Sequence, residues 1–333
     1  MMKAQRRAGL TLVELLIVLA ILAIMTTMAV TATGTLLDQS RYDATQRTLL
    51  GIEEAILGPA NTREVDGSLI VGGFVADVGR LPLTVIDAGD PDGAYKQLRE
   101  LWLPGALPAY GIYQVDVLAG APDMGPADKV SIRCGWRGPY LRLPPASTGT
   151  AQLIRDGWGN PLDILAPTRV VAAHGEPVGI VRSRGADFSV DPFPPAGDFT
   201  SDQRVTLRAL VPDAVTGEPI VDRISGSITV NIKVYNPAGG MDGNGGIEDP
   251  KASDGTVVVR LFGPANGVAS FVGEQATFPT APETTLNHTF ANVPIGPRAV
   301  RAYQGTTKRS AVTYLTVVPG GPPVKTLVLY PVL

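Results

Sequence analysis

The chain has 333 residues, of which 44% are hydrophobic and 18% charged, so it holds enough apolar material for a folded core. Its 38 glycines and 29 prolines favour many turns between short strands over a helical bundle. A net charge of -3 argues against a nucleic-acid binder, and a single cysteine excludes an internal disulfide or a cysteine-based zinc site.

The chain begins with a basic leader followed by a long apolar run. Residues 1–9 contain three basic side chains and no acid, and residues 10–33 contain one charge, Glu14. As a helix, the apolar run spans roughly 36 Å, which is enough to cross the hydrocarbon core of a membrane. The basic flank predicts that the amino terminus stays cytoplasmic while the rest of the chain is exported.

A cleaved secretory signal is the alternative interpretation of this segment. Val30-Thr31-Ala32 offers the small residues that a signal peptidase requires. However, the apolar run is longer than the core of such a signal, and it carries a carboxylate near its start. Placing Glu14 in lipid costs about 3 kcal/mol on insertion scales, so this position calls for a functional reason.

The residues Gly9-Leu10-Thr11-Leu12-Val13-Glu14 resemble the class III signal of type IV prepilins and type II secretion pseudopilins. The resemblance implies that a prepilin peptidase cuts between Gly9 and Leu10 and that the new amino terminus is methylated. It also implies that Glu14 faces the amino terminus of a neighbouring subunit, where the two buried charges compensate each other. Leu10 replaces the usual Phe. Thr31 replaces a Pro that kinks the helix in many members, so a straighter helix is expected.

Beyond the membrane segment, residues 34–58 are predicted to continue the helix with one apolar face, and Gly58-Pro59 is expected to stop it. That face requires a sheet to cover it. Its residues recur at mostly helical spacings: Leu36, Leu37, Tyr42, Thr45, Leu49, Ile52 and Ile56.

Three short motifs then follow in order within the next predicted domain, residues 59–200. They are Gly79-Arg80-Leu81-Pro82, the segment 136–141 (Trp-Arg-Gly-Pro-Tyr-Leu) and the segment 156–162 (Asp-Gly-Trp-Gly-Asn-Pro-Leu). Their order behind a prepilin signal is similar to the major-pseudopilin family of type II secretion. The resemblance implies a pilin fold, in which the long helix packs on a small antiparallel sheet.

We interpret the conspicuous residues of this domain as structural. Trp136, Tyr140 and Trp158 are expected to pack over the helix, since each aromatic ring buries a large area. Gly159-Asn160-Pro161 is typical of a tight turn. Cys134 follows a strand-like stretch, and we expect it to be a buried apolar residue rather than a reactive thiol.

The resemblance also implies a calcium site in a loop near the end of this domain. Asp187, Asp191 and Asp198 would supply its oxygen ligands. Phe188 and the run Pro192-Phe193-Pro194-Pro195 depart from the glycine-rich pattern of the family. A proline-stiffened loop without a metal is therefore the alternative, and no other cofactor is expected.

Residues 204–333 alternate between apolar and polar side chains, as β-strands do. Turn signals separate the runs, and about seven short strands at this spacing predict a Greek-key sandwich, either immunoglobulin-like or prealbumin-like. The loop 242–249 has oxygen-bearing residues at alternate positions but lacks the full spacing of a calcium loop, so we expect a hairpin tip there. The apolar positions are Ile228, Val230, Ile232, Val234, Val257, Val259, Leu261, Leu327 and Leu329.

The whole sequence therefore predicts an α+β protein and a structural role. No nucleophile-elbow, zinc-protease, Walker or dinucleotide motif occurs, and His174 and His288 are expected to be surface or strand residues rather than catalysts, so no enzyme activity is expected. The resemblance implies a subunit of a type II secretion pseudopilus or a related pilus-like filament in the bacterial inner membrane. Its expected partners are further copies of itself, other pseudopilins, prepilin peptidase and the inner-membrane assembly platform. The alternative is a minor or tip pilin whose sandwich binds an exported substrate or a surface.

Overall fold

The structure is a computed structural model of the chain. It describes residues 12–59, 71–86, 96–116, 129–143, 154–187, 189, 202–213, 218–237, 246–251, 255–279, 285–305, 308–319 and 324–331.

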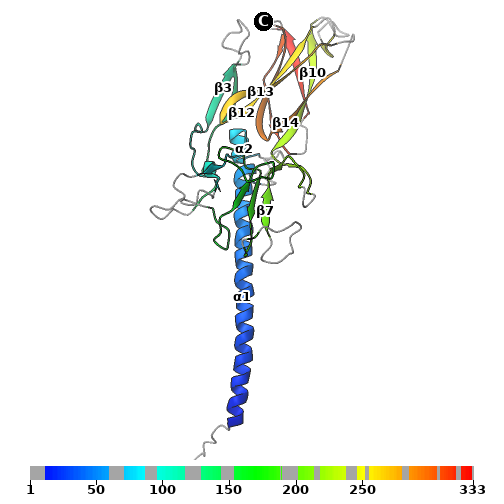
Figure 1. The fold of residues 1–333 in the computed structure, drawn as a ribbon. Helices are drawn as coiled ribbons and strands as arrows, with labels where there is room; N and C mark the ends of the chain where they lie inside the picture. Colours follow the sequence, from blue (N-terminus) through cyan, green and yellow to red (C-terminus); the bar gives the residue numbers. More distant parts are fainter. Residues whose placement is uncertain are drawn as a thin grey trace, which may run out of the picture.

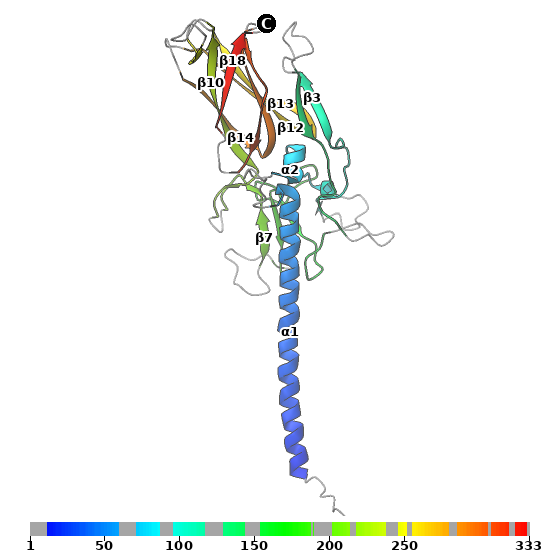
Figure 2. The same cartoon turned by 180° about the vertical axis from the view of Figure 1, so that it is seen from behind.

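One long helix carries a head made mostly of strands. Helix α1 (Leu12–Leu57) is continuous over 46 residues and projects from the head, as Figures 1 and 2 show. It ends where Gly58 adopts a positive φ of 85° and donates its N–H to the Glu54 carbonyl, at 2.8 Å. Pro59, which follows, lacks the amide hydrogen that a further turn would use. The predicted end of the helix at Gly58-Pro59 is thus confirmed.

Only the last part of the predicted apolar face of α1 is covered by the head. Thr45, Leu49, Ile52 and Ile56 are buried. By contrast, the apolar positions at the start of that face, Leu36–Leu37, are exposed. The reason is the position of the head, which packs against the final turns of the helix and leaves the preceding turns uncovered.

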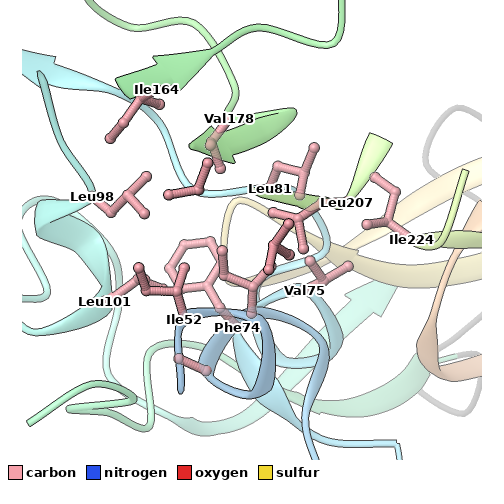
Figure 3. Close-up of a cluster of buried hydrophobic side chains, with 14 of the residues drawn as sticks. Ile52, Phe74, Val75, Leu81, Leu98, Leu101, Ile164, Val178, Leu207 and Ile224 are labelled. Carbon is pink, nitrogen blue, oxygen red and sulfur yellow. The ribbon is translucent and has the colours of Figure 1, made fainter. Parts of the chain in front are cut away.

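Short elements wrap the covered end of α1. Strands β5, β6 and β7 form an antiparallel sheet, β1 pairs with β2, and β8 pairs with β9. The core beneath them joins Ile52 of α1 to Phe74 and Val75 of α2, and Figure 3 shows their side chains converging with those of Leu101 and Val178. The elements are α2 (Gly73–Val78), β1 (Val85–Ile86), β2 (Lys96–Gln97), the 3-10 helix η1 (Arg99–Leu101), β5 (Asp163–Leu165), β6 (Ile180–Ser183), β7 (Gln203–Thr206), β8 (Arg208–Ala209) and β9 (Val221–Asp222).

The C-terminal part forms a mixed sheet of nine strands that folds over on itself. Strand β10 pairs in parallel with β18 and antiparallel with β11 and β14, whereas β15 pairs antiparallel with β12, β16 and β17. Strand β16 joins the two halves by pairing with β18, and β13 pairs with β12. The strands are β10 (Ser225–Asn236), β11 (Gly246–Glu248), β12 (Val257–Ala265), β13 (Val268–Thr277), β14 (Leu286–Pro294), β15 (Gly296–Gln304), β16 (Lys308–Ser310), β17 (Thr313–Val317) and β18 (Val324–Pro331).

The predicted alternation of this region is confirmed. Every apolar position named in the sequence is buried, and together they form one core between the two halves of the sheet. A side-chain contact links the free edges of β13 and β14, where Gln275 Nε2 donates to the Thr289 carbonyl at 2.6 Å. The long helix followed by mixed and antiparallel sheets confirms the α+β class.

A hairpin from the first predicted domain packs on the sandwich. Strands β3 (Gly111–Asp116) and β4 (Lys129–Cys134) pair antiparallel. The buried side of β4 meets strands β12 and β15 in a small core of its own. Its buried members are Val130, Ile132 and Cys134 from β4, and Phe262, Ala299 and Tyr303 from the sandwich.

The segment after α2 also lies directly on the sandwich. A Cβ atom at Gly79 would come 1.9 Å from the carbonyl oxygen of Pro264. Across the same contact, Gly267 donates its N–H to Val78 at 3.0 Å, and Arg80 Nε donates to Asn266 Oδ1 at 2.7 Å. The domain boundaries stay a prediction, but residues on both sides of them share backbone contacts and a core.

Candidate assembly site

The first half of α1 exposes an apolar surface on all sides. Residues 12–29 are exposed throughout, and Glu14 is the one charged side chain among them. The hydroxyls of Thr26, Thr27 and Thr33 donate to backbone carbonyls three or four residues earlier, at 2.6 to 3.2 Å. These donors are satisfied within the helix, as a lipid environment requires.

Glu14, the predicted assembly residue, lies within the described part of the chain. It lies in the first turn of α1, where a carboxylate interacts favourably with the helix dipole. Gly9 and Leu10, the predicted processing residues, lie outside the described part of the chain. Their roles stay predictions.

The first motif of the head is held by an ion pair. Arg80 donates two hydrogen bonds to the two oxygens of Glu100, both at 2.7 Å. Glu100 also accepts the N–H of Leu83 at 2.7 Å, and its backbone carbonyl accepts the indole N–H of Trp136 at 2.7 Å. Glu100 therefore ties the Gly79–Pro82 motif to the motif that begins at Trp136. Sequence reasoning assigned no role to Glu100, because its partners are distant along the chain.

The second motif is anchored on a buried carboxylate of α2. Asp77 Oδ2 accepts hydrogen bonds from Tyr140, at 2.9 Å, and from Arg137, at 3.0 Å. Burial raises the pKa of Asp77 above its ordinary value, although Arg137 and Tyr140 oppose the shift. The Tyr140 ring packs edge-on against Phe74 with centroids 5.6 Å apart. Trp136 and Tyr140 thus pack against the core at the end of α1, as expected.

The third motif is a turn that touches α1. Asp156 Oδ1 accepts the N–H groups of Trp158, at 3.0 Å, and Asn160, at 2.7 Å. Its other oxygen accepts the hydroxyl of Ser183 at 2.8 Å. Between them, Gly157 donates its N–H to the hydroxyl of Thr45 at 2.9 Å. The predicted tight turn is therefore an Asp-centred turn that docks on the helix.

The structure describes one of the three predicted calcium ligands, Asp187. Asp187 lies in an exposed turn and accepts the N–H of Ser189 at 2.9 Å, whereas Asp191 and Asp198 lie outside the described part. Within the described ranges, no group of three acidic, histidine or cysteine side chains is placed to hold a metal. A calcium site remains untested.

Asp163, on strand β5, is bonded by two arginines. Asp163 accepts hydrogen bonds from Arg182, at 2.7 Å, and from Arg184, at 2.8 Å. Burial alone would raise the pKa of Asp163, but the hydrogen bonds from the two arginines outweigh it and lower that pKa. This pair of cations occupies the carboxylate that would otherwise offer oxygen ligands.

Cys134 and His288 both lie in cores. Cys134 is buried, as expected, and burial raises the pKa of its thiol to about 11. His288 points inward from β14, with Nδ1 3.2 Å from Gln275 Oε1, and burial lowers its pKa. The alternation of Leu286, His288 and Phe290 is the sequence signal that marks this histidine as inward-facing.

Comparison with known proteins matches the N-terminal segment. Residues 4–30 match the prokaryotic N-terminal methylation motif, which covers part of the leader and most of the apolar run. No curated protein and no solved structure matches the chain. Within the described residues, α1 is long and apolar enough to cross a membrane, and its most apolar stretch is fully exposed. The methylation motif extends into the exposed first part of α1, and the match supports a type IV pilin-like precursor.

Proposed function

We propose that the chain is a structural subunit of a type II secretion pseudopilus, or of a closely related filament. The observation that carries the proposal is the exposed apolar stretch of α1, which has one carboxylate in its first turn and lies within the methylation motif. Such a surface is stable only in lipid or against further apolar helices. The order of the three head motifs supports the pseudopilus in particular.

Assembly would follow from cleavage between Gly9 and Leu10. The new amino group then lies four residues before Glu14, or roughly 6 Å along a helix. A buried ammonium and a buried carboxylate each cost several kcal/mol alone, but the cost is largely offset when they pair. Pairing Glu14 of one subunit with Leu10 of the next would set the axial step between packed helices.

The membrane orientation follows from the leader. Its basic residues would keep the amino terminus in the cytoplasm, and the head would lie in the periplasm. In the filament, the apolar helices would form the centre. The sandwich lies beyond the carboxyl-terminal end of α1 in both views (Figures 1 and 2), so it would be the part of the head farthest from the membrane.

A second candidate, a surface-binding tip pilin, is favoured by one feature of the sandwich. The exposed Tyr330 has its ring centroid 5.5 Å from that of the half-buried Tyr235, and the exposed Ile247 is the strand neighbour of Tyr235. An exposed aromatic side chain in such a setting suits ligand contact. Under this alternative, Tyr330→Ala lowers adhesion or substrate binding and leaves the yield of filaments unchanged.

The decisive experiment is the intact mass and N-terminal peptide of the protein from the membranes of its own cells. A chain that begins with N-methylated Leu10 and pellets as filaments supports the proposal. A soluble chain that begins at Thr33 would sink it, because the helix would then have been discarded. An uncut Met1 in the membrane would also contradict it and would indicate a plain signal anchor.

A further inference from the structure

One flank of α1 carries an open hollow with a cationic rim. The hollow measures about 560 Å³ and lies between the helix and two segments of the head. Its apolar lining comes from Gly51, Leu141, Leu143 and Ile154. Gly51 has no side chain to fill this space, and a Cβ built there would still lie 3.9 Å from the nearest side-chain atom.

Three arginines line the same hollow. Arg47 lies on α1, Arg142 directly follows the second motif, and Arg155 directly precedes the third motif, which begins at Asp156. Arg155 donates to the carbonyl of Gly159 at 2.7 Å. In the described part of the chain, no carboxylate pairs with any of the three. No acidic residue lines the hollow among those that the structure describes, so it suits an occupant that is apolar in the centre and acidic around it.

The head also exposes an apolar patch, which we define as Val170, Val171, Leu210, Val211 and Ile220. Their exposed fractions lie between 40% and 62%. The segments that carry them are joined by hydrogen bonds. Leu210 donates to the Pro167 carbonyl at 2.8 Å, and the Arg169 side chain donates to the carbonyls of Val211, at 3.0 Å, and Pro219, at 3.3 Å. Exposed apolar surface of this kind marks a contact site.

The surroundings of the patch carry the opposite charge to the hollow. Segments 166–176 and 210–220 contain one arginine against Glu176, Asp213 and Glu218, and Arg204 of β7 also pairs with Glu218, so this group has a formal net charge of -1 with histidine neutral. Asp213 and Glu218 both pair with Arg169, whose side chain is 10% exposed, whereas theirs are 21% and 20% exposed. The patch and the hollow therefore each present apolar side chains, and their net charges are opposite in sign.

The two surfaces lie on different flanks of α1. Gly51 lines the hollow, whereas Glu53 forms an ion pair with Arg223, three residues after Ile220. Residues two apart on a helix project about 160° away from each other. Strand β7, which leads into the patch segment, lies beside α1 in both views of the molecule (Figures 1 and 2). The patch and hollow of one chain therefore face different neighbours.

We propose that the apolar patch of one copy docks into the arginine-rimmed hollow of the next copy. This inference rests on the proposed filament and names the contact between its heads. A contact between two different surfaces of identical chains repeats without closing when successive copies are related by a screw rotation, so it builds a filament rather than a dimer. The apolar centre supplies the driving force, and the charges select the partner and its orientation.

Cysteine cross-linking of the full-length chain in membranes tests this contact. Val171→Cys and Arg142→Cys place one thiol on each surface, and a short bismaleimide joins thiols of adjacent copies. The double variant should give a ladder of dimers, trimers and longer products, and each single variant should stay monomeric. Wild-type protein reports any background from Cys134, whose buried thiol is expected to be unreactive.

Val324→Cys combined with Arg142→Cys is the matched control, because Val324 is exposed to a similar extent but lies on the sandwich. Its ladder should be at least about tenfold weaker, equivalent to about 1.4 kcal/mol. Dimers from Val171→Cys alone would overturn the proposal, since they require patch-to-patch contact. The absence of a ladder from the double variant would also overturn the proposal, provided that the wild-type protein in the same cells is methylated and pellets as filaments. The proposed function would then stand.

A charge in the patch gives a second test that does not depend on cross-linking. Val171→Asp should lower the pelleted filament fraction at least about tenfold, because it places an extra carboxylate in the apolar centre of the contact. Val324→Asp should leave that fraction unchanged. Equal effects of the two substitutions would overturn the docking. A wild-type protein that is neither methylated nor pelleted would refute the proposed function, and this inference with it.

Discussion

The backbone of Gly157 rests directly on helix α1 at Arg41. A Cβ atom added at Gly157 would come 1.9 Å from the Arg41 carbonyl oxygen, and the Gly157 N–H already bonds to Thr45. The turn of the third motif therefore packs directly on the backbone of the helix. Gly157 is required here for close approach between two backbones, and its φ is not in the left-handed region.

Gly157→Ala should therefore separate the turn from the helix. A methyl group at that position would force one backbone aside, and overpacking of this kind costs about 1–3 kcal/mol. Gly111→Ala is the matched control, because its added Cβ would meet Tyr113 at an ordinary 3.7 Å. Thermal unfolding of both purified variants measures the difference. Equal melting temperatures would show that the turn tolerates displacement.

The contact between the β4 side of the head and the sandwich should control the reactivity of Cys134. Phe262 lies in the same small core as Cys134 and is fully buried. Phe262→Ala removes about 3–5 kcal/mol of packing and should open that core. The thiol pKa would then fall from about 11 toward its ordinary 9.0, which raises the thiolate fraction at pH 8 up to about a hundredfold. Maleimide labelling rates measure this change.

Phe278→Ala is the control for that experiment, because Phe278 is an exposed side chain of the sandwich. Its labelling rate should equal that of the wild type. If Phe262→Ala also labels slowly, Cys134 is shielded by its own hairpin alone.

Because of the shared core, deleting residues 204–333 should expose β4 and destabilise the head, so point variants are the better probes of sandwich function.

His288 should make the sandwich sensitive to acid. Its ring is buried in β14, and burial lowers its pKa below the ordinary 6.5. The folded state therefore favours the neutral ring. The resulting stability is fully present above pH 6.5 and is lost as the pH falls through the folded pKa.

His288→Leu should remove this dependence. The free energy of unfolding of the wild type minus that of the variant should decrease between pH 7.5 and pH 5, because the wild type alone must take up a proton on unfolding. Denaturant unfolding at several pH values gives the difference, and carboxylates common to both proteins cancel. A pH-independent difference would mean that the folded protein protonates His288 without cost.

Glu14→Gln should separate processing from assembly. The substitution keeps the length of the side chain and the recognition residues Gly9 and Leu10, so cleavage and membrane insertion should continue. It removes the charge that would compensate a buried amino terminus, and filament yield should fall at least about tenfold. N-terminal mass and the pelleted fraction provide the two measurements. Normal filaments from Glu14→Gln would show that the register is set elsewhere.

Local patterns predicted the long helix and the alternating strands of the C-terminal region. The helix stop at Gly58 and the inward faces of β10, β12 and β18 follow from spacings of a few residues, which act through backbone geometry and side-chain direction. The start of the covered face was less predictable. Leu36 and Leu37 have the right spacing for burial but are exposed, because coverage depends on where the head packs.

The partners within the head lay beyond such patterns. Asp77 meets Tyr140 across 63 positions and Gly157 meets Thr45 across 112. Such long separations in sequence produce no periodic pattern of residue types, since these contacts form only when separate segments pack. The motifs were recognisable as structural, whereas the carboxylates that hold them, Asp77 and Glu100, were not.

By itself, the sequence determined the leader, the exposed apolar helix with Glu14, the α+β class and the alternating strands, because each depends on residue type at short spacing. Tertiary structure decided the rest. It placed the β4 hairpin on the sandwich, closed the head around the end of α1 and set an apolar patch and a cationic hollow on different flanks. These relationships depend on long-range packing, in which the burial of apolar area selects neighbours that local conformational preferences do not specify.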